Sequence, residues 1–212
     1  TERDQAFLIY LQNEYKITHS DSNSYNVPLN EIFFNYINDI LNFDGELTDK
    51  EIGQIIELLK FKGFTHFQIL DKSDNTGIKT IYKQDLIDKL FIKALSKKEL
   101  NDNHVKDLIN LGADVDISFS SGDSFPLMEL VKRSKFELVK LLIEKRANIN
   151  KANQDGETPL WACLYCNGKK GINILELLID NGANILPING PKILPDVIKS
   201  GNLEALKIML KN

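Results

Sequence analysis

The sequence predicts a mainly α-helical protein whose larger part is a stack of repeated helix pairs. Two observations lead to this prediction. Apolar residues recur at three- and four-residue intervals along most of the chain, which is the spacing of amphipathic helices. In addition, an Ala followed by Asp or Asn closes a helix at Ala113, Ala147 and Ala183. These endings recur about every 35 residues, which indicates an internal repeat.

Residues 1–80 are predicted to form a helical cap or accessory region with a short β-hairpin. Apolar spacing predicts helices over 1–15 and from Pro28 to Phe43. Thr48 and Glu51 have the spacing of a capping box, so a third helix should begin there and end by Gly63. Apolar, β-branched segments flank a turn-rich loop near residues 66–82, and they predict the hairpin.

Residues 81–212 are predicted to hold the repeats, and the unit that begins at Asn153 is the most complete. Asp155 and Gly156 predict a tight turn. Thr158 can cap the helix that follows, and Pro159 fits the first helical turn because its missing N–H costs nothing there. A second apolar helix then runs from Ile174 and closes near Gly182.

The earlier and later units follow the same plan with weaker signals. Helices are expected from Asp85 to Ala94 and from Val105 to Leu111, before the first repeated ending. In the next unit the apolar pattern predicts that Leu141 is buried, as it does for Leu160 in the third. The last unit begins irregularly at Ile193 and becomes regular again from Gly201.

A turn, two helices and a glycine stop at this spacing resemble the ankyrin repeat, over roughly residues 80–212. The third unit keeps the family's Thr-Pro-Leu at 158–160, with Trp161 where histidine is usual. In the second unit Phe125 replaces the threonine and Met128 the histidine. About four repeats with atypical ends are expected. Lys169-Lys170-Gly171 is predicted to be an insertion between two helices.

The resemblance implies a non-catalytic protein–protein recognition module. In this family the loop tips and the concave face of the first helices carry the partner contacts. The exposed candidates by position are Ser121, Asp123, Ser124, Met128, Lys132, Arg133, Lys151, Gln154, Asp155, Glu157, Trp161 and Tyr165.

Trp161 is the residue for which a contact role is most strongly expected, because tryptophan often contributes a large share of binding energy at interfaces. Tyr165 lies four residues further on the same predicted helix face. The alternative for Trp161 is that it fills the place of the usual histidine inside the repeat. For the polar loop-tip residues the alternative is simple solvation.

The composition is typical of a globular protein, with 42% hydrophobic and 26% charged residues among 212. The net charge of −4 disfavours nucleic acid as a partner and is compatible with a basic protein. We expect a monomer or a 1:1 complex. The sequence has no apolar run of about 18 residues, so no membrane span is predicted. The acidic start, with Glu2 and Asp4, argues against a secretory signal.

Cys163 and Cys166 have the spacing of a redox pair or of half a zinc site, but the three histidines are scattered along the chain. We expect both cysteines in one helix, with Cys163 serving only to pack the core. No metal and no cofactor are expected. Cysteine usage indicates a reducing compartment, hence a cytoplasmic protein, or one delivered into a host cell if it is an effector.

Enzymatic activity is not expected, since no phosphate-binding loop or nucleophile elbow is present. The loop that begins at Asp71 resembles part of a calcium site, but its glycine comes one residue late and position twelve is Tyr82. A sharper version of the binding function is a microbial effector or immunity protein. The alternatives are an enzyme with chemistry in residues 1–80 and substrate-selecting repeats, and a winged-helix-like nucleic-acid binder.

Overall fold

The computed structural model describes residues 47–60, 66–71, 77–119, 122, 124–166, 168–185, 193–200 and 202–211. The helices predicted over 1–15 and 28–43 lie outside these residues. None of the described helices has the length and apolar character needed to cross a lipid bilayer.

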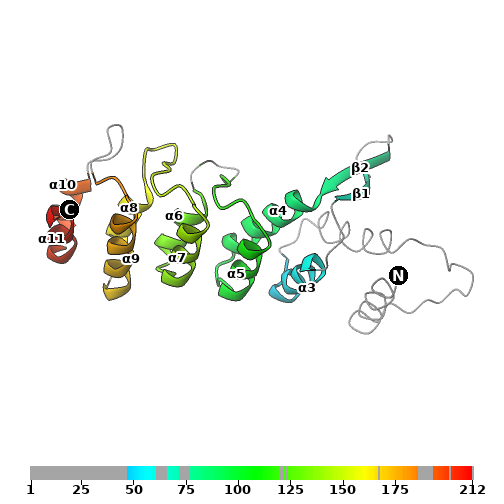
Figure 1. The fold of residues 1–212 in the computed structure, drawn as a ribbon, viewed down its shortest axis with the longest axis horizontal. Helices are drawn as coiled ribbons and strands as arrows, with labels where there is room; N and C mark the ends of the chain where they lie inside the picture. Colours follow the sequence, from blue (N-terminus) through cyan, green and yellow to red (C-terminus); the bar gives the residue numbers. More distant parts are fainter. Residues whose placement is uncertain are drawn as a thin grey trace, which may run out of the picture.

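Four consecutive helix pairs form a row along the molecule (Figure 1). Each pair has a first helix and a second helix, and the second helices lie along one edge of the row. The first helices are α4 (Lys83–Ser96), α6 (Pro126–Lys132), α8 (Pro159–Ala162, continued by the 3-10 turn η1, Cys163–Tyr165) and α10 (Ile193–Ser200). The second helices are α5 (Asp102–Asn110), α7 (Phe136–Glu144), α9 (Gly168–Asp180) and α11 (Leu203–Lys211).

The repeated Ala endings close the second helices through the same backbone bonds. The N–H groups of Ala113, Ala147 and Ala183 donate to carbonyls five residues earlier, at 3.0, 3.0 and 2.9 Å. This bond requires a preceding residue with positive φ. Gly112 and Gly182 supply it at φ 97° and 90°, whereas Arg146 occupies the same place at φ 65°. The ending therefore tolerates a non-glycine residue at a conformational cost.

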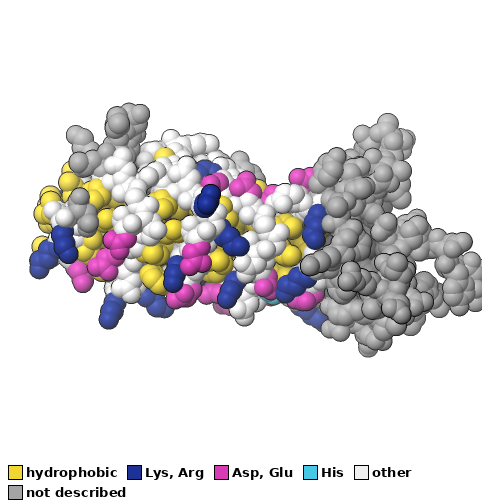
Figure 2. All heavy atoms as spheres, viewed as in Figure 1, with side chains coloured by type: hydrophobic (Ala, Val, Ile, Leu, Met, Phe, Trp, Pro, Cys, Tyr) yellow, Lys and Arg dark blue, Asp and Glu magenta, His cyan; other side chains and the backbone are white. Residues whose placement is uncertain are grey.

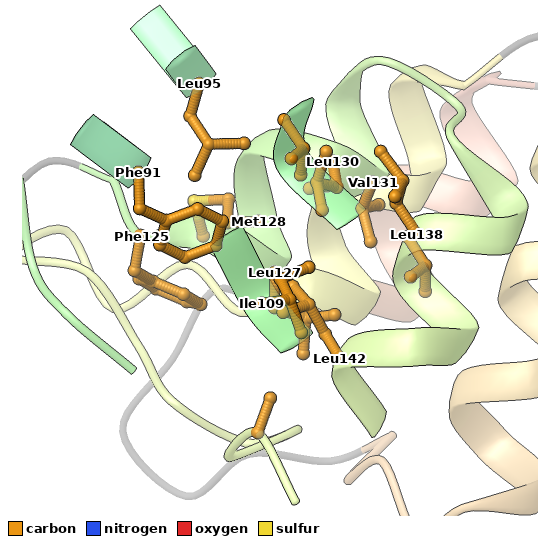
Figure 3. Close-up of a cluster of buried hydrophobic side chains, with 14 of the residues drawn as sticks. Phe91, Leu95, Ile109, Phe125, Leu127, Met128, Leu130, Val131, Leu138 and Leu142 are labelled. Carbon is orange, nitrogen blue, oxygen red and sulfur yellow. The ribbon is translucent and has the colours of Figure 1, made fainter. Parts of the chain in front are cut away.

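A continuous hydrophobic core runs through all four pairs, from Leu47 to Met209. Figure 3 shows one section, where Phe91 and Leu95 of α4 lie beside Phe125 and Met128 at the start of the second unit. The prediction that Leu141 is buried was wrong, because it is only half-buried while its neighbour Leu142 is fully buried. Because α7 contacts α5, α6 and α9, the positions of these neighbouring helices determine which of the two leucines is fully buried.

Polar side chains form a second connection between successive units. A side-chain oxygen at the end of one unit accepts a backbone N–H from the next. The bonds are Asn148 N–H to Asp116 Oδ1 at 2.9 Å and Asn184 N–H to Asn150 Oδ1 at 2.8 Å. Within the first unit, Asp88 of α4 accepts the Asp114 N–H in the same way at 2.7 Å. The repeated Asp and Asn residues therefore hold the loops in register.

The helix α3 (Asp49–Lys60) extends the stack on its N-terminal side. Its predicted capping box is confirmed, since Thr48 N–H donates to Glu51 Oε2 at 2.6 Å and Glu51 N–H to Thr48 Oγ1 at 3.2 Å. Buried isoleucines of α3 belong to the common core, and Lys60 Nζ lies 3.1 Å from Asp107 Oδ2 on α5. The cap is thus joined to the first repeat by both apolar and ionic contacts.

Two antiparallel strands precede the repeats, within the predicted hairpin segment. The strands β1 (His66–Asp71) and β2 (Gly77–Tyr82) pair from His66 opposite Tyr82 to Asp71 opposite Gly77. The strand β2 leads directly into α4. The boundary between an N-terminal region and the repeats near residue 80 stays a prediction.

Candidate functional site

The loop at the start of the third unit is a rigid turn with an exposed tip. Asn153 Oδ1 accepts the N–H groups of Asp155 at 3.1 Å and Glu157 at 2.8 Å, and the Asn153 N–H donates to the Glu157 carbonyl at 3.0 Å. Gly156 closes the turn at φ 78°. Gln154 and Asp155 are exposed at its tip. Both are therefore presented to solvent on a fixed backbone.

The helix start that follows this loop is as predicted. Thr158 has an extended backbone, and its hydroxyl accepts the Trp161 N–H at 3.4 Å. Pro159 occupies the first helical position. The helix α8 ends at Ala162, however, and the chain tightens into the 3-10 turn η1. The prediction that both cysteines lie in one helix was therefore wrong. Cys163 begins η1 and Cys166 follows it, because the chain must turn there before α9 begins.

The loop of the second unit is described only in part, and Ser121 and Asp123 lie outside the described residues. Gly122 N–H donates to the Phe119 carbonyl at 2.7 Å, and Gly122 has a φ of 69°. A Cβ added at Gly122 would lie 3.1 Å from Gln154 Cδ, so the loops of neighbouring units pack against each other. Ser124 is half-buried.

On α6 the predicted contact residues separate into buried, bonded and exposed side chains. Met128 is fully buried, which corrects its assignment to the exposed surface. It occupies the place of the family's histidine and fills the core beside Phe91 (Figure 3). Arg133 Nε lies 2.7 Å from Glu129 Oε1, and its NH1 donates to the Lys97 carbonyl at 2.5 Å. Only Lys132 is freely exposed among these.

Two further candidates on the loop side have structural partners. Lys151 Nζ donates to the Asp116 carbonyl and to Ser118 Oγ at 2.9 Å, and it lies 5.1 Å from the centre of the Phe125 ring. Glu157 Oε2 accepts the side-chain amide of Asn153 at 2.8 Å. Both side chains are half-buried, so their first role is to stabilise the loops.

Trp161 combines features of both alternatives, a partner contact and a replacement for the usual histidine inside the repeat. It is half-buried and packs against the core, as a replacement for histidine would. The smaller part of the side chain stays accessible on α8, which contacts α6. The backbone of Tyr165 is in η1, while its side chain is outside the described part of the structure.

Cys163 and Cys166 are both buried free thiols. Cys166 Sγ donates to the Val131 carbonyl of the preceding unit at 3.0 Å. Burial raises the pKa of both thiols, strongly for Cys163, so neither is activated as a nucleophile. Among the described residues, no group of His, Cys, Asp and Glu side chains could hold a metal ion.

The prediction that Lys169-Lys170-Gly171 is an insertion between two helices was wrong. The segment belongs to the first turns of α9. The extra residues lengthen this helix to 13 residues, against nine in α7 and α11. Gly171 is buried against the end of η1, where an added Cβ would lie 2.5 Å from the Cys166 carbonyl oxygen. The insertion is therefore accommodated by a close contact between the two helices of the unit.

The comparison with known proteins agrees with this geometry. Residues 90–189 match the family model described as ankyrin repeats, in three copies. This part of the chain is an array of ankyrin repeats. Such arrays are protein–protein interaction modules, with each repeat stacked only on its neighbours.

Several ankyrin-repeat proteins are similar in sequence. Ankyrin repeat protein OPG189 of vaccinia virus (strain Copenhagen) is 30% identical over 116 residues, which cover 55% of this chain and 20% of that protein. Its monkeypox virus counterpart is 34% identical over 85 residues, 40% of this chain and 14% of that protein. The chain thus spans about a fifth or less of these relatives. A putative ankyrin repeat protein of Borreliella burgdorferi is 24% identical over 156 residues, 69% of this chain and 68% of that protein.

Sequence reasoning missed one surface of the array. Ile198, Leu203 and Leu210 are large apolar residues on the last helix pair that are 62%, 68% and 70% exposed. The helical spacing predicts an apolar face there, but it gives no sign of whether another element covers that face.

Proposed function

We propose that the ankyrin array recognises a specific protein partner, without catalysis, through its loop tips and the exposed side of its first helices. The observation that carries this proposal is the accessible set formed by Gln154, Asp155, Lys132 and Trp161. Gln154 and Asp155 belong to the loop at the start of the third unit, Lys132 to α6 and Trp161 to α8. The helices α6 and α8 pack against each other. They would present one aromatic and three polar side chains on a rigid framework.

The rigidity of the framework favours binding. The turn at Asn153, the Lys151 contacts and the inter-repeat bonds fix the backbone before any partner arrives. Little conformational entropy is then lost when a partner binds. Trp161 is the expected centre of the interface, since even a partly exposed indole offers an aromatic contact area with few torsions to restrict.

The finer expectations concern the kind of partner. The net charge of −4 supports a basic protein, and binding should then weaken as salt is added. A microbial effector or an immunity protein would act by this kind of binding alone, because occupying a partner's surface can block it without any reaction.

Affinity capture from the native organism, followed by mass spectrometry, tests this proposal. The bait is the full chain, compared with Lys132→Glu and Trp161→Ala. Lys140→Glu is the matched control, because Lys140 is equally an exposed lysine of the same repeat but lies on the second helix α7. We expect one protein that the parent and the control recover and that both surface variants lose.

Thermal unfolding of each bait shows that the lost capture is not lost folding, which matters most for the half-buried Trp161. The proposal fails if no protein is recovered by the parent chain. It also fails if Lys132→Glu and Lys140→Glu reduce recovery equally, since the partner would then not use the first-helix side.

A further inference from the structure

The short turns that join the two helices of each repeat lie at the opposite end of the helices from the loops. The first three turns, with the helix ends beside them, comprise residues 97–102, 129–137 and 166–171. They hold seven Lys and Arg residues but only four Asp and Glu residues, whereas the loops over 112–118, 146–157 and 180–185 hold five acidic and two basic residues. On the face shown in Figure 2, basic and acidic side chains are interspersed over the repeats. The net charge of −4 therefore does not describe the surface locally, and the edge formed by the three turns is basic.

The three turns contact one another along this basic edge. Arg133 NH1 of the second turn donates to the Lys97 carbonyl of the first turn at 2.5 Å. Cys166 Sγ of the third turn donates to the Val131 carbonyl, directly before the second turn, at 3.0 Å. The basic edge is therefore one continuous surface that crosses three repeats.

Lysines of the basic edge are exposed at every one of the three turns. They are Lys98 at the first turn, Lys132 at the second, and Lys169 and Lys170 at the third. None of the four forms an ion pair with another side chain in the described part of the chain. The neighbouring Arg133 is paired with Glu129 at 2.7 Å. Lys135 is likewise paired with Asp102 at 2.8 Å. The four exposed lysines thus supply positive charge that a partner can reach.

Lys169 and Lys170 lie where the other second helices have an acidic residue. Asp102, Glu137 and Glu204 occupy the first turns of α5, α7 and α11, whereas the first turn of α9 has no acidic residue. The N-terminal end of a helix carries a partial positive charge, so two lysines there lower the stability of α9. They also belong to the residues that make α9 longer than α7 and α11. A departure from the repeat that costs stability is expected where a function depends on it.

We propose that the basic edge binds an acidic segment of a protein, with carboxylates opposite Lys98, Lys132 and the pair formed by Lys169 and Lys170. Successive turns are separated by one helix-to-helix distance, about 8–10 Å. An extended chain covers this distance with about three residues. A segment with an acidic side chain at about every third position can therefore contact all three turns at once. One exposed ion pair contributes little to affinity, so the contacts at the three turns have to act together.

A nucleic acid fits the basic edge less well than an acidic peptide does. Glu99 and Glu137 are exposed beside the lysines of the first and second turns. A nucleic acid carries a phosphate at every nucleotide, so some of its phosphates would lie against these carboxylates. A peptide can have uncharged residues at those places and acidic residues opposite the lysines. The alternation of charge along the edge therefore favours a protein segment.

Fluorescence anisotropy tests this, with the full chain titrated into a labelled peptide of repeated Glu-Gly-Ser triplets. We expect a Kd below roughly 1 mM at roughly 50 mM salt, and weaker binding as salt is added. Lys98→Glu should raise the Kd at least about threefold, and Lys169→Glu combined with Lys170→Glu at least about tenfold. The double variant should also raise Tm, because it places carboxylates at the positive end of α9. Lost binding with a raised Tm cannot come from lost folding.

The matched control is Lys140→Glu combined with Lys145→Glu, which changes the net charge by the same amount. Both lysines are exposed, in α7 and directly after its end, away from the turns. This control should raise the Kd less than about twofold.

Three results would overturn the proposal: no binding of the peptide up to roughly 1 mM chain, equal losses from the two double variants, or tighter binding of a single-stranded oligodeoxythymidine with the same number of charges. The partner recognition proposed above is judged separately, by capture with Trp161→Ala. The two surfaces share only Lys132, and none of the variants used here alters it.

Discussion

Replacing Leu142 by Ala on α7 tests how the repeats share their core. Leu142 is fully buried between helices of two repeats, whereas Leu141, its neighbour in the chain, is half-buried. Removing three buried carbon atoms costs about 2–3 kcal/mol in transfer free energy, at about 0.8 kcal/mol per group. The cavity that remains raises the cost to about 3–5 kcal/mol.

The matched variant is Leu141→Ala, for which we expect about 1–2 kcal/mol, because part of the side chain already contacts water and no closed cavity forms. Urea unfolding followed by circular dichroism gives both free energies of unfolding, if the slope with denaturant is the same for the two variants. In thermal unfolding, Leu142→Ala should lower Tm by roughly 6–20 °C. Equal losses for the two variants would refute the assignment of the helix faces.

Three further predictions concern local contacts. Hydrogen bonds from Thr48 lower the pKa of Glu51 in the folded chain, so the carboxylate part of the capping box stabilises α3 at neutral pH and its contribution is lost as the pH falls below about 4.5. Thr48→Ala, measured by urea unfolding across that range, should cost about 1 kcal/mol at pH 7 and less at pH 3, where only the bond from the Glu51 N–H to Thr48 Oγ1 is left to lose. Burial raises the pKa of Cys163, so the neutral thiol contributes fully to the free energy of unfolding below the usual thiol pKa of about 8.5, and this contribution declines at higher pH. A thiol reagent should label Cys163 only after unfolding, and rapid labelling of the native chain would contradict its burial. Gly171→Ala should cost about 1–3 kcal/mol in free energy of unfolding, because its Cβ would lie 2.5 Å from the Cys166 carbonyl oxygen, whereas Gly168→Ala meets no neighbouring atom and loses stability only through its φ of 78°.

Part of the candidate site could be predicted from position in the repeat, and part could not. Gln154, Asp155 and Lys132 are exposed as expected, because turns and the polar side of a short helix point to solvent whatever their neighbours. Met128 and Arg133 follow the same positional rule and yet are buried or bonded. Met128 packs beside Phe91 of α4, and Arg133 donates to the Lys97 carbonyl just after α4, so both contacts join residues more than thirty positions apart. Only the ion pair between Arg133 and Glu129, four residues apart on α6, is local.

The sequence by itself determined the local features of this protein. The capping box at Thr48, the Thr158 and Pro159 helix start and the Ala endings all depend on bonds between residues three to five apart. Only the tertiary structure decided that Leu142 rather than Leu141 is fully buried and that Leu203 and Leu210 are exposed. It also shows that Asp116 and Asn150 each accept a backbone N–H of the next unit. Burial depends on which helix lies alongside, and in a stack that helix belongs to another repeat.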